Sequence, residues 1–433
     1  MKRLNSTPSL PGFPNTRYKI RLLRLVRLYQ SQRNAHYETI AFRLSFRDSL
    51  TPAKTDRARY RSDKLRRGGI SPTETIATKD DRVSKSRRFR SNARRPIRSR
   101  FFRYSHRRTN HPAESLDKFK PMSGYLNELT MRLAVGASLL PAELRSRHAH
   151  WLRKQQRADG GFAGREGDSD PYYTAFALRA LWILGELDES IGQASARFLR
   201  QRMTRRDSVI DLISLIFASA IVEMATGVVV ISDDDADWRH NVAATLSTLR
   251  CDDGGFAKTP EGRAGSTYQT FLTVLCHELM DVPVADTDSI AGFLSSQQHV
   301  DGGFLEIRVA KRAGVNPTAA AIGTMKTLGF LDPAEQIDTA EFVADMQSDE
   351  GGFTANTRIP FADLLSSFTA LTTLVDLDET ALISVPRVQR YAESMQSPEG
   401  GFVGFTLDQV ADVEYTFYGL GTLSLCAALT ADS

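Results

Sequence analysis

Apolar residues recur every three to four positions through residues 173–184, and Gly185 follows them. This spacing is typical of a helix with a buried face, and the glycine is typical of a helix that ends on a left-handed residue. A Gly-Gly-Phe motif stands ahead of this run, and an earlier apolar run ends in glutamines just before the motif. The order predicts a unit of helix, glycine turn and helix, in which the glycines allow positive φ.

The same unit is repeated along the chain. The Gly-Gly-Phe motif occurs five times, at intervals of 94, 48, 49 and 49 residues, so a unit that lacks the glycines is expected near Asp207. Repeats of this length bury their apolar faces against their neighbours. Six units give twelve helices, and we expect an all-α protein, an α/α toroid whose second helices form the inner wall. The motifs begin at Gly160, Gly254, Gly302, Gly351 and Gly400.

The second helix of most units is preceded by a residue that can cap it. Such side chains accept a hydrogen bond from the free N–H groups at a helix start. Each lies 10 to 14 residues after the first glycine of its unit, so we expect the caps to line one rim of the ring. The candidates are Asp170, Ser266, Asn316, Asp363 and Asp412.

The chain changes in composition near residue 121. Residues 1–121 hold 32 Lys and Arg against 9 Asp and Glu, whereas residues 122–433 hold 24 against 42. The first segment lacks apolar periodicity, and its composition predicts disorder. Three hypotheses remain for it: a nucleic-acid-binding arm, a transit peptide, or sequence upstream of a true start at Met122. Nucleic acid is expected as a partner only if this segment is functional, and the toroid is assigned to residues 122–433.

One segment has the length and composition of a membrane span. Residues 212–231 contain a single charge, Glu223. They fall where the second helix of the unit without glycines belongs, which favours a buried wall helix. We expect no secretory signal, because the N-terminus lacks an apolar run followed by small residues, and the three cysteines show no paired spacing, as is usual in a reducing compartment. We therefore expect a cytoplasmic protein without a membrane span.

The repeated pattern resembles a known family. Gln-x-x-x-Asp-Gly-Gly-Phe is followed by Tyr-Thr-x-x-Ala-Leu-x-x-Leu-x-x-Leu-Gly, and the repeats cover about residues 123–431. This resembles the β subunits of protein prenyltransferases, most closely the geranylgeranyltransferase type II kind, and squalene and hopene cyclases have related repeats. The resemblance implies a toroid with an apolar funnel for an isoprenoid diphosphate, a zinc ion at the rim that holds the acceptor thiolate, and a partner subunit of the α type.

The zinc position of that family is matched only in part. The family holds zinc by an Asp, by a Cys two residues later and by a His in the last unit; Asp363 matches the Asp, but Leu365 and Tyr415 replace the others. Zinc takes about four N, S or O donors, so we expect that zinc is not retained. Asp412 and Glu414 add oxygen atoms, which favour a harder ion such as magnesium. Asp363, Asp412, Glu414 and Tyr415 are the candidate catalytic residues.

Cations stand at or near the places where the resemblance implies a diphosphate site. Arg312 precedes Ala-Gly where the family has a His, Arg263 is its counterpart one unit earlier, and Arg358 lies near the place of an Arg/Lys pair. Lys311 adds charge to the same loop. Guanidinium groups bind phosphate well, so these four residues are predicted to bind the diphosphate. The alternative is that they are ordinary charges on exposed loops.

The sequence leaves three functions open, and it does not decide whether the protein is an enzyme. The first is prenyl transfer, with an atypical or absent zinc site. The second is a non-catalytic toroid that binds a lipid or a protein partner. The third is a terpene cyclase, but the Asp-x-Asp-Asp motif of cyclases is absent. An Asp-Asp-x-x-Asp pattern at residues 233–237 is predicted to be a solvated turn.

Overall fold

The computed structural model describes residues 124–203, 208–231 and 237–431. These residues form thirteen α-helices and two short 3-10 helices, and their β pairing is limited to isolated bridges. The basic segment 1–121, Asp207 and residues 232–236 lie outside the described residues. The helices are α2 (Tyr125–Leu139), α3 (Ala142–Lys154), α4 (Pro171–Ile183), α5 (Glu189–Arg202), α6 (Val209–Thr226), α7 (Trp238–Ser247), α8 (Thr267–Met280), α9 (Thr287–Gln297), α10 (Val315–Leu328), η1 (Pro333–Glu335), α11 (Ile337–Asp345), α12 (Leu364–Asp376), η2 (Thr380–Leu382), α13 (Val385–Ser394) and α14 (Val413–Ala431).

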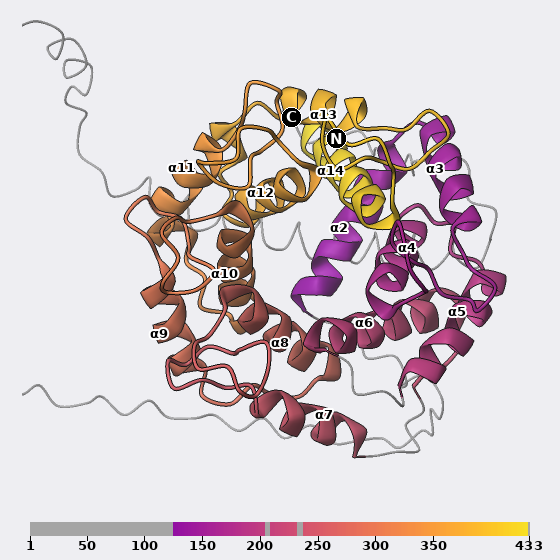
Figure 1. Ribbon diagram of the computed structural model, residues 1–433. Helices are drawn as coiled ribbons and strands as arrows, with labels where there is room; N and C mark the ends of the chain where they lie inside the picture. The colour runs from indigo at the N-terminus through magenta and orange to yellow at the C-terminus, as the bar shows by residue number, and fades with distance from the viewer. Residues whose placement is uncertain (1–123, 204–207, 232–236, 432–433) are drawn as a thin grey trace, which may run out of the picture. The chain divides into compact units, whose positions relative to one another are not determined.

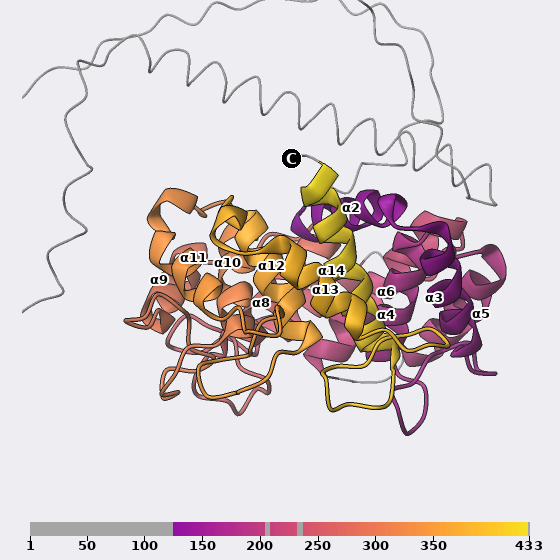
Figure 2. The ribbon, with the colours of Figure 1, turned by 90° about the horizontal axis from the view of Figure 1, so that it is seen from above.

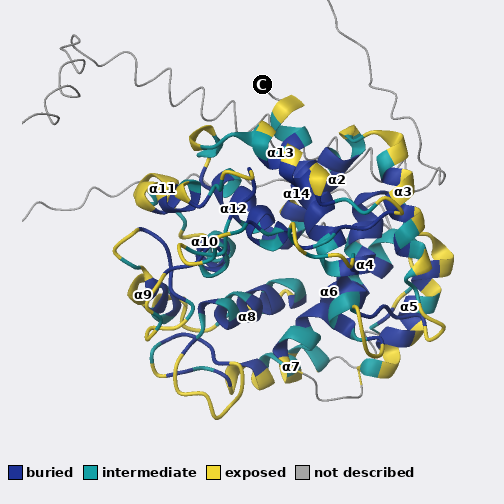
Figure 3. Cartoon of the chain, turned by 45° about the horizontal axis from the view of Figure 1, so that its top comes forward, coloured by how far each residue is buried: buried dark blue, intermediate teal, exposed yellow. Residues whose placement is uncertain are grey.

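Six helix pairs close into a ring, which confirms the predicted all-α toroid (Figure 1). The even-numbered helices α4 to α14 form the inner wall, and α3, α5, α7, α9, α11 and α13 lie outside them. The outer helices expose their far sides, whereas buried residues concentrate on the inner helices (Figure 3). The unit expected near Asp207 is present as α5 and α6.

The glycine turns require glycine for two reasons. Gly302 has φ of 91°, a conformation that residues with a Cβ rarely adopt. A Cβ at this position would also lie 2.2 Å from the backbone oxygen of Asp338 in the next outer helix. The following Phe304 is 1% exposed, and its N–H donates to the hydroxyl of Thr318 at 2.9 Å. Each turn thereby fixes the start of its inner helix against the neighbouring unit.

The predicted caps line one end of the ring, which we call the rim. Asp170, Ser266 and Asp363 are the N-caps of α4, α8 and α12, and Asp412 accepts the N–H of Tyr415 at the start of α14. The prediction for Asn316 was wrong, because α10 begins at Val315 after Gly314. In the other units that carry the Gly-Gly-Phe motif, the cap residue forms a backbone bridge to the Phe of that motif. In this unit Gly314 forms the bridge to Phe304, and the bridge sets the helix start.

Helix α2 lies across the opposite end of the ring, which we call the base (Figure 2). The carboxylate of Glu278, near the end of α8, accepts the N–H groups of Tyr125 and Leu126 at 2.7 and 3.2 Å. Asp376, the last residue of α12, accepts hydrogen bonds from the Tyr125 hydroxyl, Arg132 and Lys326 at 3.1, 3.3 and 2.7 Å. Lys326, near the end of α10, also donates to Glu128 of α2 at 3.4 Å, so the base is covered by one helix that is bonded to the ends of three inner helices.

Helix α6 corresponds to the segment with the composition of a membrane span. It is the one helix in the described part of the chain that is long and apolar enough to cross a membrane. It packs between α4 and α8 in the inner wall, with Ile213, Ile216 and Val222 buried. Its position in the ring agrees with the predicted wall helix.

The ring closes between its first and last units. The N–H of Gly401 donates to Nδ1 of His148 at 3.0 Å, and the imidazole stacks on Phe402 at 4.6 Å between ring centroids. Burial lowers the pKa of His148 to about 4, so the imidazole is neutral at pH 7. In this seam α3 takes the place that the next outer helix takes in the other units.

Candidate functional site

Two of the predicted catalytic acids are held by hydrogen bonds at the rim. Asp363 accepts the N–H of Ser366 at 2.7 Å on one oxygen and the hydroxyl of the same residue at 2.8 Å on the other. Asp412 accepts the N–H of Tyr415 at 2.8 Å, and its second oxygen accepts Nε–H of Arg165 at 2.8 Å. Burial raises the pKa of Asp363. Both carboxylates therefore serve first as helix caps.

Glu414 differs from these two acids. It is half-buried, and one oxygen accepts the hydroxyl of Tyr172 at 2.6 Å. Among the described residues, no donor reaches its second oxygen. Burial raises the pKa of Glu414, with a further rise from the charge of Asp412, and the hydrogen bond from Tyr172 opposes this shift. Glu414 is thus an acid with one free oxygen and a proton affinity above the usual value.

Tyr415 lies in the electrostatic field of all three acids. Burial, then the charges of Asp363, Glu414 and Asp412, raise its pKa to about 12, so the phenol stays protonated at neutral pH. The guanidinium of Arg165 lies 5.8 Å from the centroid of its ring. The structure therefore brings the four predicted catalytic residues into one sector of the rim.

The residues at the family's zinc position do not fit a metal ion. Both oxygens of Asp363 are engaged by Ser366, Leu365 packs against the hydrophobic core, and Tyr415 is a protonated phenol. In the described part of the chain, no three His, Cys, Asp or Glu side chains are grouped to hold a metal ion. This geometry suits neither zinc, which needs about four donors, nor a magnesium site made by the protein.

The four predicted diphosphate-binding residues are exposed on rim loops. Arg263 and Lys311–Arg312 come shortly before α8 and α10, and Arg358 comes five residues before Asp363. No hydrogen bond or ion pair joins these side chains to one another or to other residues in the described ranges. The structure therefore places them on the expected rim without a preformed cluster.

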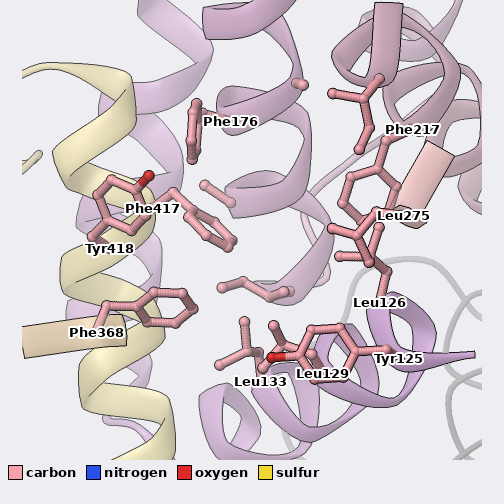
Figure 4. Packing of buried hydrophobic residues seen from close by; sticks show 14 of the residues in the cluster. Tyr125, Leu126, Leu129, Leu133, Phe176, Phe217, Leu275, Phe368, Phe417 and Tyr418 are labelled. Carbon is pink, nitrogen blue, oxygen red and sulfur yellow. The ribbon is translucent and has the colours of Figure 1, made fainter. Parts of the chain in front are cut away.

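Buried aromatic side chains from several inner helices pack together inside the ring and form an aromatic wall. Phe176, Phe368, Phe417 and Tyr418 pack with centroids 5.2 to 5.7 Å apart where they touch. Phe217 of the neighbouring helix α6 lies beside this group, and side chains of α2 lie below (Figure 4). Aromatic faces offer large apolar area with fixed geometry, so this wall is suited to a hydrocarbon ligand.

One charged side chain stands in this wall. Arg179 of α4 lies with its guanidinium carbon 4.0, 4.9 and 5.6 Å from the ring centroids of Phe417, Phe217 and Phe176. Burial lowers its pKa to about 10, and nearby phenols oppose that shift. Arg179 is still a cation at pH 7, and no carboxylate or hydrogen-bond acceptor among the described residues pairs with it.

Sequence reasoning missed Arg179, Arg165 and Tyr172. A signal existed for Arg179, because it is the only charged residue in the otherwise apolar helix α4. No signal existed for Arg165, because its partners Asp408 and Asp412 are more than 240 residues away and only the closed ring brings them together. The same holds for Tyr172 and Glu414.

Comparison with known proteins identifies the family. The sequence profile of the prenyltransferase alpha-alpha toroid domain matches residues 95–305 and 318–432. No curated protein matches the chain. The solved structure of Candida albicans protein geranylgeranyltransferase-I complexed with GGPP is 16% identical, with a TM-score of 0.50 over 65% of this chain and 91% of that one. The type II terpene cyclase MstE from Scytonema is 12% identical, with a TM-score of 0.47 over 69% and 99%.

The repeated helix pairs, the ring that they close and a profile match over more than half of the chain agree with one another. This protein belongs to the prenyltransferase alpha-alpha toroid family.

Proposed function

We propose that the interior of the ring binds the hydrocarbon chain of an isoprenoid diphosphate, which enters from the rim. The observation that carries this proposal is the aromatic wall formed by Phe176, Phe217, Phe368 and Phe417. Helix α2 covers the base, so the rim is the end at which a ligand can enter. An inner helix such as α4, with 13 residues, spans about 20 Å, a depth that suits an extended chain of several isoprene units.

The diphosphate is proposed to lie at the rim. Arg312 and Arg358, with Arg263 and Lys311, are exposed there and have no acidic partner in the described ranges. The inner helices also begin at this end, and the start of a helix carries partial positive charge. Both effects favour an anionic head over a neutral one.

Transfer is proposed to proceed without a zinc-bound thiolate, and Glu414 is the proposed base. The acceptor's nucleophilic atom forms a bond to C1 of the prenyl chain while the bond from C1 to the diphosphate oxygen breaks. The diphosphate leaves with the bonding electrons, and the acceptor's proton moves to the free oxygen of Glu414. A raised pKa makes Glu414 a better base than an ordinary carboxylate.

Binding without catalysis is the second candidate function. It is favoured by Leu365 and Tyr415, which replace two of the three zinc ligands that the family resemblance implies. Prenyl transfer that depends on Glu414 would exclude it. An α-type partner subunit stays a prediction under either function.

The test is calorimetric titration of geranylgeranyl diphosphate and geranylgeraniol into the wild type, Arg312→Ala and Arg358→Ala. Each charge-assisted contact contributes about 1.5–3 kcal/mol, so each variant should bind the diphosphate about tenfold to a hundredfold more weakly. Affinity for the alcohol should change little, because it depends on the aromatic wall. Equal affinity of all three proteins for the diphosphate would remove the rim assignment, and a wild type that binds neither ligand would remove the proposed function.

A further inference from the structure

We infer that Arg179 forms a second anion site, inside the ring, that binds the carboxylate of an amphipathic monocarboxylic acid with an isoprenoid chain. This inference shares the aromatic interior with the proposed function but does not use the rim cations, so the two can fail separately.

The position of Arg179 is the first support. Its guanidinium lies 4.0 Å from the centroid of Phe417 and 4.9 Å from that of Phe217, and the side chain is only partly exposed. A charge in such surroundings is costly unless an opposite charge or hydrogen-bond acceptors accompany it. The aromatic faces offset part of this cost, but they leave the in-plane N–H donors without acceptors among the described residues.

Two phenols near Arg179 supply further donors. Burial raises the pKa of Tyr268 to about 12 and that of Tyr418 well above its usual value, while the charge of Arg179 opposes both shifts. Both phenols therefore lie within the electrostatic range of the guanidinium and stay protonated at neutral pH. Neither hydroxyl has a hydrogen-bond partner among the described residues, whereas that of Tyr172 is bonded to Glu414. One partly exposed cation and two neutral donors within its electrostatic range thus lack an acceptor among the described residues.

This donor set fits a single negative charge. A carboxylate accepts two parallel N–H bonds from one guanidinium, and phenol groups can donate to its remaining lone pairs. A diphosphate carries at least two charges, and a single cation in a low-dielectric interior would leave one of them buried and uncompensated. The hydrocarbon part of the acid would lie against Phe176, Phe368 and the neighbouring aromatic rings.

The depth of Arg179 separates this site from the rim. Arg179 is nine residues beyond the cap Asp170 in α4, which corresponds to about 13 Å along the helix axis. A ligand held at Arg179 therefore carries its charge well inside the ring, whereas one held at Arg312 carries it at the surface. The two arrangements predict different responses to substitution at the two arginines.

The experiment is calorimetric titration of geranylgeranoic acid and geranylgeraniol, each below its micelle concentration, into the wild type at pH 7.5. The acid should bind about tenfold or more tightly than the alcohol, as expected for one buried charge-assisted pair. Arg179→Gln should bind the two ligands about equally, and Arg179→Lys should retain part of the preference. Arg312→Ala is the matched control at the rim and should keep the full preference.

Three results would overturn the inference. The first is equal affinity of the wild type for acid and alcohol, which needs no variant and so does not depend on how Arg179→Gln folds. The second is a preference for the acid that disappears in Arg312→Ala and persists in Arg179→Gln. The third is a diphosphate that binds the wild type more tightly than the acid and loses that advantage in Arg179→Gln. If the acid binds as expected and the diphosphate does not bind at all, the inference stands and the proposed function fails.

Discussion

The two ends of the ring are each organised around one charged side chain, but with opposite signs. At the base, Asp376 lies between Arg132 and Lys326 and is 2% exposed. At the rim, Arg165 lies between Asp408 and Asp412 and is 36% exposed. The base network fixes a covering helix, whereas the rim network joins the loops of the first and last units and leaves Glu414 with a free oxygen. We infer that the base is built for stability and that the rim is the end available for ligands.

The largest effect is expected at the base. Asp376→Ala removes the acceptor of Tyr125, Arg132 and Lys326, and breaking a largely buried charge network in this way costs about 3–5 kcal/mol. The free energy of unfolding, from denaturant titration, should fall by that amount. Asp288→Ala, an exposed acid in the first turn of α9, is the control and should change stability little. Similar losses in both variants would contradict a structural role for the base network.

A smaller effect is expected at the rim. Arg165→Ala leaves Asp408 and Asp412 without their shared cation. Because Arg165 is exposed enough for solvent to screen the interaction, the free energy of unfolding should fall by only about 1 kcal/mol. Burial raises the pKa of Asp408, but hydrogen bonds from Arg165 and the backbone outweigh it and lower the pKa overall. That stabilisation is present above the unfolded pKa and is lost as pH falls through the folded pKa.

The difference in the free energy of unfolding between wild type and Arg165→Ala should therefore become smaller in acid and in high salt. Denaturant titrations at pH 7 and pH 3, each at low and high ionic strength, measure it. A difference that is constant across these conditions would show that Arg165 acts through packing.

Glu414→Gln should have a still smaller effect on stability, of opposite sign. Burial raises the pKa of Glu414, so the folded state binds a proton more tightly than the unfolded state does. The contribution of protonated Glu414 to the free energy of unfolding is fully present below the unfolded pKa and is lost as pH rises through the folded pKa. The amide, which needs no proton, should stabilise the protein at pH 8 by no more than about 1 kcal/mol, the size of an ordinary hydrogen bond. The gain should vanish near pH 4, as measured by thermal unfolding at both pH values.

The smallest effect is expected from truncation. Deletion of residues 1–121 should leave the melting temperature of the ring essentially unchanged, because that segment has too little apolar periodicity to add to a core. Calorimetric scans of both proteins test this. A marked drop would mean that α2 needs the preceding residues to hold its place at the base, and the profile match that begins at residue 95 makes the test informative.

The ring could be predicted from the sequence because each unit encodes its own turn and cap. Gly302 and Phe304 with Thr318, for example, lie within one unit of the repeat, and their local contacts mark the start of α10. Asn316 was predicted as the cap because its side chain can accept a backbone hydrogen bond. The cap is Gly314 instead, because the backbone bridge from Phe304 forms at that residue.

The candidate site was predictable only in part. Asp363 was predicted because it matches the family's zinc Asp, and Asp412 and Glu414 because they are acids next to Tyr415 in the last unit. The pairs Tyr172–Glu414 and Arg165–Asp408 join residues more than 240 positions apart, and spacing within a unit carries no information about them. The surroundings of Arg179 depend in the same way on rings from α6 and α14.

The seam at His148 has a consequence for how the chain folds. Its bond to Gly401 spans 253 residues, so α3 has no partner on that side until the last unit is present. Contacts between distant residues form slowly, because the intervening chain must first lose its freedom. During synthesis from the N-terminus, we expect neighbouring units in the middle of the chain to stack early and the seam to close last. Pulsed hydrogen exchange, with amide protection at Gly401 arising after that at Phe304, would report this order.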